Sequence, residues 1–208
     1  MSSLPWTRRT RGLLWAGLLT GVLTSGCLGS PRPTSEFLTL PRTANPATGE
    51  ATRSRGASLG LGPVTVAPHL ERRYLAYRID ASRVEFADST QWAAPLDGMV
   101  SEYLLSRLAE TLGSENLRAW PWPQRRAPEV QLDLHLEEFA VGPDGDATVA
   151  ARWSVRDPGS GAGRAGGFWE ETVPADGSSS SAQVAALGAA LDALAEFLVQ
   201  RVGDQGVG

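Results

Sequence analysis

Hydrophobic and polar residues alternate along several short stretches of this chain. Successive side chains of a β-strand point to opposite faces of a sheet, so a strand with one buried face shows a period of two. Between Leu136 and Phe139 the apolar positions shift by one residue, which predicts a β-bulge. The turn-forming residues 142–146 then predict a hairpin. The stretches expected to be strands are residues 63–67, 74–79, 83–86, 130–141, 147–155 and 166–173.

Two longer segments repeat apolar residues every three or four positions, which places those residues on one stripe of a helix. The first helix is expected over residues 91–112 and the second over residues 182–202. One sheet and two helices with single apolar stripes predict an α/β fold: a two-layer domain, with one mixed, mostly antiparallel sheet and two main helices packed on it.

The residues around each helix predict where it begins and ends. Pro95 is tolerated only near the first turn of the first helix. The expected caps are Ser89 or Thr90 and Gly113 for the first helix, and a serine of 178–181 and Gly203 for the second.

Residues 1–26 are typical of a signal peptide. Three arginines precede an apolar run at 12–23, which is shorter than the roughly twenty residues that span a bilayer. Leu23-Thr24-Ser25-Gly26-Cys27 resembles a lipobox, so cleavage is expected between Gly26 and Cys27, with lipid attached to Cys27. Thr24 stands where leucine is usual, and the competing interpretation is an ordinary secretory signal. Cys27 is the one cysteine of the chain, and an unmodified thiol would be a liability in an oxidising compartment.

The rest of the chain divides by composition. Residues 27–58 are rich in Ser, Pro, Thr and Gly and are expected to form a flexible tether, with a short strand added at 36–40. Residues 59–203 are long enough for one domain with one core, and residues 204–208 form a tail. Acidic residues (23) outnumber basic ones (19) without any basic cluster, which argues against binding to nucleic acid.

No set of residues predicts catalysis, a metal ion or a cofactor. Residues 161–166 match G-x-G-x-x-G, but a strand-like run follows them where a nucleotide site needs a helix, so a flexible hairpin loop is expected. His69 and His135 stand apart, and neither a G-x-S-x-G motif nor a second cysteine offers a nucleophile. A metal site would need clustered His, Cys or carboxylate residues. We therefore expect a protein that is not an enzyme.

Tryptophan is the residue type that most invites a binding role. Trp120-Pro121-Trp122-Pro123 cannot be regular strand or helix throughout, because proline lacks an N–H group. The alternative left open is that one of these two tryptophans is exposed at an edge, where aromatic residues favour contacts with partners. For the tryptophans as a set, and for Trp153 above all, packing in the core is the favoured interpretation.

Segments spread over most of the chain resemble the PqiC-like ABC-type transport auxiliary lipoproteins. The resemblance rests on Phe37-Leu38-Thr39-Leu40, on Val64 to Pro68 followed by Tyr74-Leu75, and most specifically on Val84 to Leu96 with its Trp92-Ala-Ala-Pro95-Leu96 motif. Tyr74, Leu75, Trp92, Pro95, Trp120 and Trp122 are the candidate partner-binding residues.

The resemblance implies a lipoprotein on the periplasmic face of the outer membrane, since Leu28 replaces the aspartate that retains lipoproteins in the inner membrane. It also implies work beside an MCE-type periplasmic protein and inner-membrane transport components, with a docking or structural role in lipid transport. A homo-oligomer is left open. The alternative function is a periplasmic carrier that binds lipid itself, which would need an apolar cavity of several hundred Å³.

Overall fold

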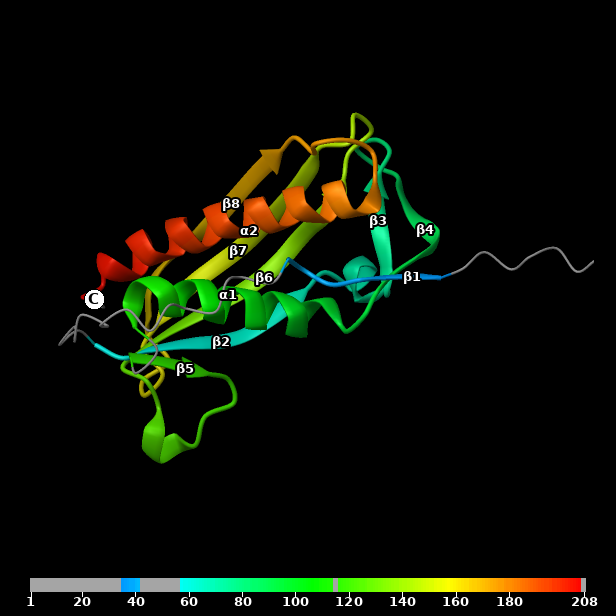
Figure 1. Ribbon diagram of the computed structural model, residues 1–208. Coiled ribbons are helices and arrows are strands. Elements are labelled where there is room, and N and C mark those ends of the chain that lie inside the picture. Colours follow the sequence, from blue (N-terminus) through cyan, green and yellow to red (C-terminus); the bar gives the residue numbers. More distant parts are fainter. Residues whose placement is uncertain (1–34, 42–56, 114–115, 207–208) are drawn as a thin grey trace, which may run out of the picture. The chain divides into compact units, whose positions relative to one another are not determined.

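The computed structural model describes residues 35–41, 57–113 and 116–206, which form one open sheet of eight strands with two helices packed on one face (Figure 1). The expected two-layer α/β fold is confirmed. The signal peptide, Gly26, Cys27 and most of the expected tether lie outside the described residues. The strands are β1 (Glu36–Leu38), β2 (Leu59–Val66), β3 (Tyr74–Arg78), β4 (Val84–Trp92), β5 (Leu117–Ala119), β6 (Val130–Val141), β7 (Ala147–Arg156) and β8 (Gly163–Val173). The helices are α1 (Leu96–Leu112) and α2 (Ser180–Gly203), with short 3-10 turns η1 (Pro68–Glu71) and η3 (Gln124–Arg126).

Strand β6 organises the sheet. One edge of β6 pairs antiparallel with β7 along its length, and β8 continues the sheet beyond β7. The other edge pairs in parallel first with β2, over 130–136, and then with β3, at 140–141. Strand β5 adds to β2, whereas β4 and then β1 add to β3. Consequently β5, with β2 between it and β6, lies at the end of the sheet where β6 starts. The β3–β4–β1 group lies at the end of the sheet where β6 finishes.

The core lies between the sheet and the helices. Leucines at alternate positions of β6 meet the apolar stripes of both helices, and Leu132, Leu136, Leu104, Leu108, Leu187 and Leu194 are fully buried. Each fully buried leucine contributes about 1.5–3 kcal/mol relative to an exposed one. Among the described residues α2 alone is long and apolar enough to cross a bilayer. Its stripe is buried against the sheet and α1, so α2 is the core helix of this domain.

The expected start of the first helix is wrong by five residues. Strand β4 continues to Trp92, and α1 begins only at Leu96, directly after Pro95. Ser89 and Thr90 therefore lie in the strand, and Pro95 holds the N-cap position without a side-chain hydrogen bond. A residue before proline is disfavoured in helical conformation, which explains the late start. The predicted C-terminal end of α1 is confirmed, because Gly113 has a φ of 79° and its N–H donates to the Ala109 carbonyl.

The boundary between tether and domain also differs from expectation. The short strand expected within the tether exists: β1 pairs in parallel with β4, and Leu38 and Leu40 are buried. Pro41 then lies against α2, where a Cβ added to Gly188 would come within 2.9 Å of the proline Cγ. The folded domain therefore includes residues 35–41, which composition alone assigns to the tether.

Two further expectations concern the long hairpins. The bulge is confirmed, since the register between β6 and β7 shifts between Leu136 and Glu138. The glycine-rich segment differs from the expected flexible loop, because β8 already begins at Gly163. The turn before it is held by Asp157, whose Oδ1 accepts hydrogen bonds from the amides of Gly159 (2.8 Å) and Ser160 (3.0 Å). These two bonds lower the pKa of Asp157.

Candidate functional site

The tryptophan loop, defined as Trp120 to Pro123, follows β5 at the edge of the sheet. The Trp120 N–H donates to the Leu61 carbonyl at 3.1 Å, which continues the pairing of β5 with β2. Trp122 lies over Gly60 of β2: a Cβ added at Gly60 would lie 2.7 Å from the indole ring and 2.4 Å from Pro128 Cγ. The missing side chain of Gly60 therefore makes room for Trp122, and the loop is fixed against the sheet.

Trp120 is presented to solvent by this arrangement. Its ring stands edge-on to that of Trp122, with the centroids 5.0 Å apart and the planes at 90°, and 52% of Trp120 is exposed. The exposed arginines Arg125 and Arg126 follow within η3. Tryptophan and arginine dominate the binding energy of protein interfaces, and a ring held in place loses little entropy on binding. Of the two interpretations that the sequence left open for this segment, core packing and exposure at an edge, Trp120 follows the second.

Two of the other candidate partner-binding residues belong to the core. Trp92 is only 2% exposed and packs on Phe139 with ring centroids 5.7 Å apart, while Leu75 is fully buried. Both sit at strand positions that face the helices, so neither side chain is available to a partner; for these two the prediction is wrong. Trp153 is buried as expected. Pro95 and Tyr74 are exposed.

An exposed aromatic residue that was not among the candidate partner-binding residues lies two strands away from Tyr74. Phe37 of β1 is 64% exposed and is paired in register with Gln91 of β4. Tyr74 of β3, 37% exposed, pairs with Gln91 from the other side. These three side chains form one row across three strands, because residues in register share a face of the sheet. Only the parallel pairing of β1 with β4, which local periodicity does not reveal, brings Phe37 into this row.

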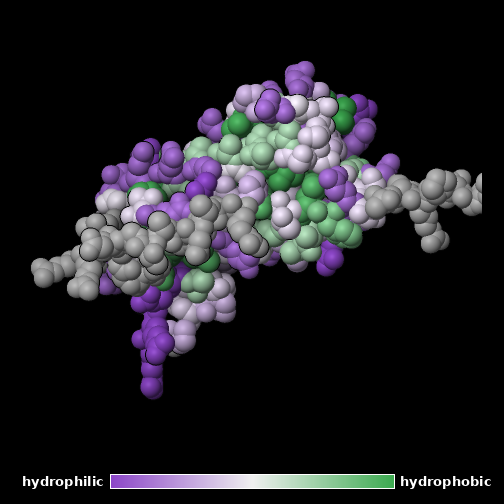
Figure 2. All heavy atoms as spheres, viewed as in Figure 1, coloured by the Kyte–Doolittle hydropathy of each residue, from purple (hydrophilic) through white to green (hydrophobic). Residues whose placement is uncertain are grey.

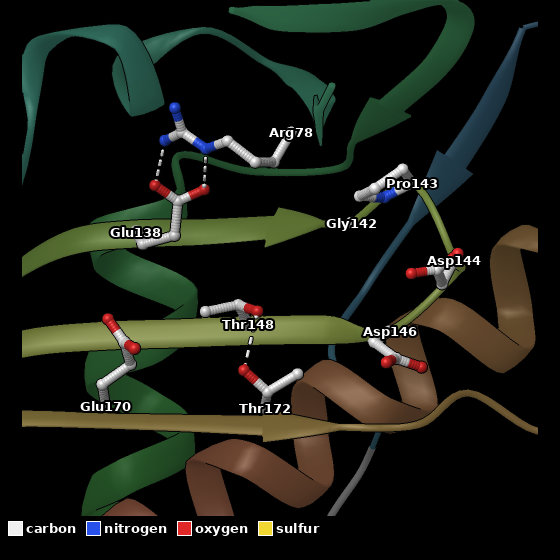
Figure 3. A pocket seen from close by; sticks show the side chains of 9 residues that line it. All are labelled: Arg78, Glu138, Gly142, Pro143, Asp144, Asp146, Thr148, Glu170 and Thr172. Carbon is white, nitrogen blue, oxygen red and sulfur yellow. Dashed lines mark hydrogen bonds and ion pairs between the residues drawn. The ribbon is translucent and has the colours of Figure 1, made fainter. Parts of the chain in front are cut away.

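A polar pocket of about 360 Å³ lies on the open face of the sheet, the face opposite the helices, next to the β6–β7 turn (Figure 3). In it the Arg78 guanidinium forms an ion pair with the Glu138 carboxylate, and Thr148 and Thr172 share a hydrogen bond of 3.0 Å. The carboxylates of Asp144, Asp146 and Glu170 complete the acidic lining. A pocket lined by charged and polar side chains can accommodate water or cations but not an acyl chain.

A second pocket, of about 400 Å³, lies between the outer surfaces of α1 and α2. Asp192 of α2 accepts hydrogen bonds there from Arg107 and from the Tyr103 hydroxyl, both on α1. Burial and the bond to Asp192 raise the pKa of Tyr103 to about 12, and the bond to Asp192 also raises the pKa of Arg107. Charged residues therefore line this pocket as well, and their contacts join the helices.

The hydropathy of the surface of α2 differs between the two ends of the helix. Figure 2 shows hydrophobic residues gathered toward the first half of α2, whereas hydrophilic residues cover its second half. The sequence of α2 explains this, since no charged residue occurs between Ser180 and Leu191, and Asp192, Glu196 and Arg201 follow.

The residues that the structure describes contain no group of three His, Cys, Asp or Glu side chains placed to hold a metal ion. His135 lies on the open face, where its Nδ1 is 2.9 Å from Thr65 Oγ1. This contact joins neighbouring strands β6 and β2.

Fold and site together define a two-layer domain that exposes aromatic residues at the edges of its sheet. The model of one protein family, described as the ABC-type transport auxiliary lipoprotein component, matches residues 38–199, and the chain belongs to this family. No curated protein matches the chain.

Two crystal structures have a similar fold. Protein XCC0632 from Xanthomonas campestris has a TM-score of 0.64 at 15% identity, covering 83% of this chain and 95% of that one. The crystal structure of an uncharacterized protein has a TM-score of 0.65 at 15% identity, covering 81% of this chain and 99% of that one. At this identity the likeness shows the fold alone.

Proposed function

We propose that this chain is an outer-membrane lipoprotein that docks an MCE-type periplasmic protein in an ABC-linked system moving lipids between membranes. Membership of the auxiliary lipoprotein family supports the transport role, and the lipobox-like segment ending in Cys27 supports the anchor. The role is docking rather than catalysis. The observation that carries the docking role is Trp120, held half-exposed on Trp122 and Gly60 at the sheet edge.

The tryptophan loop has the composition and rigidity of a protein-binding site. Trp120 supplies a large apolar surface, and Arg125 and Arg126 supply positive charge beside it on a chain whose net charge is −4. A partner surface that is apolar at its centre and acidic at its rim would match this corner. Charge of this kind speeds and orients association more than it strengthens it.

The two pockets described above do not favour the alternative, a lipid-binding carrier. Both are lined by charged side chains, whereas an acyl chain needs apolar walls. A mass spectrum of the domain purified without its anchor would detect a retained phospholipid. Retention of lipid at one molecule per chain would favour the carrier.

Docking is tested by comparing Trp120→Ala with Phe168→Ala in the detergent-solubilised, full-length lipoprotein. The two side chains are matched in exposure, at 52% and 50%, but Phe168 lies on β8, away from the loop. Binding to the purified MCE-type protein is expected to weaken by about thirtyfold or more for Trp120→Ala. Phe168→Ala is expected to change it less than twofold. Equal affinities of both variants, or failure of the native chain to bind, would contradict the proposal.

The anchor is tested separately by the intact mass of membrane-extracted protein. A mass equal to residues 27–208 plus three acyl chains is expected, and Cys27→Ala should release the chain from membranes. Separation of inner and outer membranes then reports where the acylated chain resides. An unmodified, soluble native chain would contradict the anchor while leaving the docking test intact.

A further inference from the structure

The row of Phe37, Gln91 and Tyr74, named here the Phe37–Tyr74 patch, is an exposed aromatic surface that the docking role does not use. Its neighbours along the same strands, Leu38 and Trp92, are buried and paired with each other, so the patch faces the opposite way, toward solvent. Phe37 is the most exposed large hydrophobic side chain among the described residues, at 64%.

The patch lies at the end of the sheet by which the chain enters the domain. Ten residue steps separate Cys27 from Phe37, and a fully extended chain of that length reaches at most about 36 Å. Without β1 in the sheet, the chain from Cys27 would run to residue 59 before the domain began. The pairing of β1 with β4 therefore keeps this end of the sheet within that reach of any anchor at Cys27.

The tryptophan loop lies toward the other end of the sheet. Pro128, which packs against the Gly60 position together with Trp122, comes just before the start of β6, whereas Ala76 of β3 pairs with Ala140 near its end. Tyr74 lies two residues before Ala76 in β3, which runs parallel to β6, so about eight residue steps, or roughly 27 Å at the usual strand rise, separate the row of the patch from the start of β6. When the β1 end rests on the membrane, the tryptophan loop is directed away from it.

We propose that the Phe37–Tyr74 patch rests on the phospholipid bilayer to which Cys27 is anchored, an inference that relies on the acylation in the proposed function. Aromatic side chains favour the boundary between headgroups and acyl chains, and tyrosine can keep its hydroxyl among the headgroups. Arg72 and Arg73 are both exposed and directly precede Tyr74, with the Arg72 guanidinium 4.9 Å from the centroid of the Phe86 ring, so they would supply positive charge for lipid phosphates beside the patch. Two rings bind a membrane weakly alone, but the anchor makes their contact intramolecular.

The test places a photo-crosslinking benzoylphenylalanine at position 37 of the full-length acylated protein in phosphatidylethanolamine and phosphatidylglycerol vesicles. Matched samples carry it at 168 and at 120, where the native side chains have similar exposure. Intact mass after illumination identifies what is attached. Phospholipid adducts are expected at position 37 at about ten times the yield at 120 or 168, the ratio for an aromatic group held against a membrane rather than in water.

Three outcomes would overturn the inference: equal lipid yields at the three positions, no lipid adduct at 37, or an adduct at 37 to a protein chain. A protein adduct would make the patch a docking surface for a second copy or another protein. The same spectra report the three acyl chains on Cys27. A chain without them refutes the anchor in the proposed function, whereas an acylated chain without lipid adducts refutes only the orientation. Phe37→Ser should reduce residual vesicle binding of the Cys27→Ala chain, while Phe168→Ser should not.

Discussion

Arg107 of α1 and Asp192 of α2 form a bidentate ion pair across the two helices, with Nε 2.6 Å from Oδ1 and Nη2 2.7 Å from Oδ2. The Tyr103 hydroxyl donates to the same carboxylate at 2.7 Å and lies 3.1 Å from the Gly188 carbonyl. One carboxylate of α2 therefore fixes two side chains of α1. Since both helices cover the same sheet face, these contacts set how the helices sit beside each other.

The coupling between Arg107 and Asp192 is expected to be measurable. A double-mutant cycle with Arg107→Ala and Asp192→Ala should give about 0.5–1.5 kcal/mol from urea unfolding, since the pair is bidentate and only partly exposed. The control is Arg83 and Glu85, whose charged atoms are 3.9 Å apart on an exposed edge. That pair should give a coupling near zero. Equal couplings for the two pairs would contradict the structural role of Asp192.

Tyr103 should make stability fall at alkaline pH. Its pKa of about 12 in the folded chain lies above the ordinary value of 10.0, so the folded chain keeps a proton that the unfolded chain loses. Its contribution is complete below pH 10 and is lost as the pH rises from 10 toward 12. Tyr103→Phe should cost about 1–2 kcal/mol at neutral pH and flatten this loss. Urea unfolding at pH 8 to 11 checks both effects, and a variant with the native slope would contradict them.

Gly60→Ala should displace Trp122, because the new Cβ would overlap the indole ring and Pro128. A loss of about 1–3 kcal/mol in unfolding free energy is expected, with a change in tryptophan fluorescence. Gly98→Ala is the matched control, since nothing lies within 4 Å of its Cβ position on α1. That variant should gain about 0.5–1 kcal/mol from helix propensity. A neutral Gly60→Ala would mean that the loop is not held by this contact.

The docking of the segment after β1 depends on Gly188. Gly188→Ala gains helix propensity but brings a Cβ within 2.9 Å of Pro41 Cγ, so thermal unfolding is expected at a lower temperature. In the Pro41→Ala background the same substitution should instead raise the unfolding temperature, because the overlapping atoms are gone. Destabilisation of similar size in both backgrounds would show that Pro41 does not rest on α2.

The local pattern of hydrophobic and polar residues was enough to predict the strands and helices whose own sequence is periodic. The hairpin of β6 and β7, the bulge after Leu136 and the end of α1 at Gly113 follow from alternation, a phase shift and a glycine. The N-cap of α2 also follows, since Ser179 accepts a hydrogen bond from the Ala182 amide. These features depend on interactions between residues close in sequence, which the chain records directly.

The tertiary structure decided what depends on residues far apart in sequence. The sequence predicted the short strand β1 but not its partner β4, which lies 54 positions away, and it therefore left β1 in the tether. Trp92 and Leu75 belong to the motifs behind the family resemblance, yet their side chains face the helices and are buried. The pairing of β1 with β4 that places Leu38 opposite the buried Trp92 leaves Phe37 exposed. Sequence thus determined the class of domain, and the structure decided which aromatic side chains are exposed. The second aromatic surface arose only from strand register, because a parallel pairing leaves no local signature in either strand.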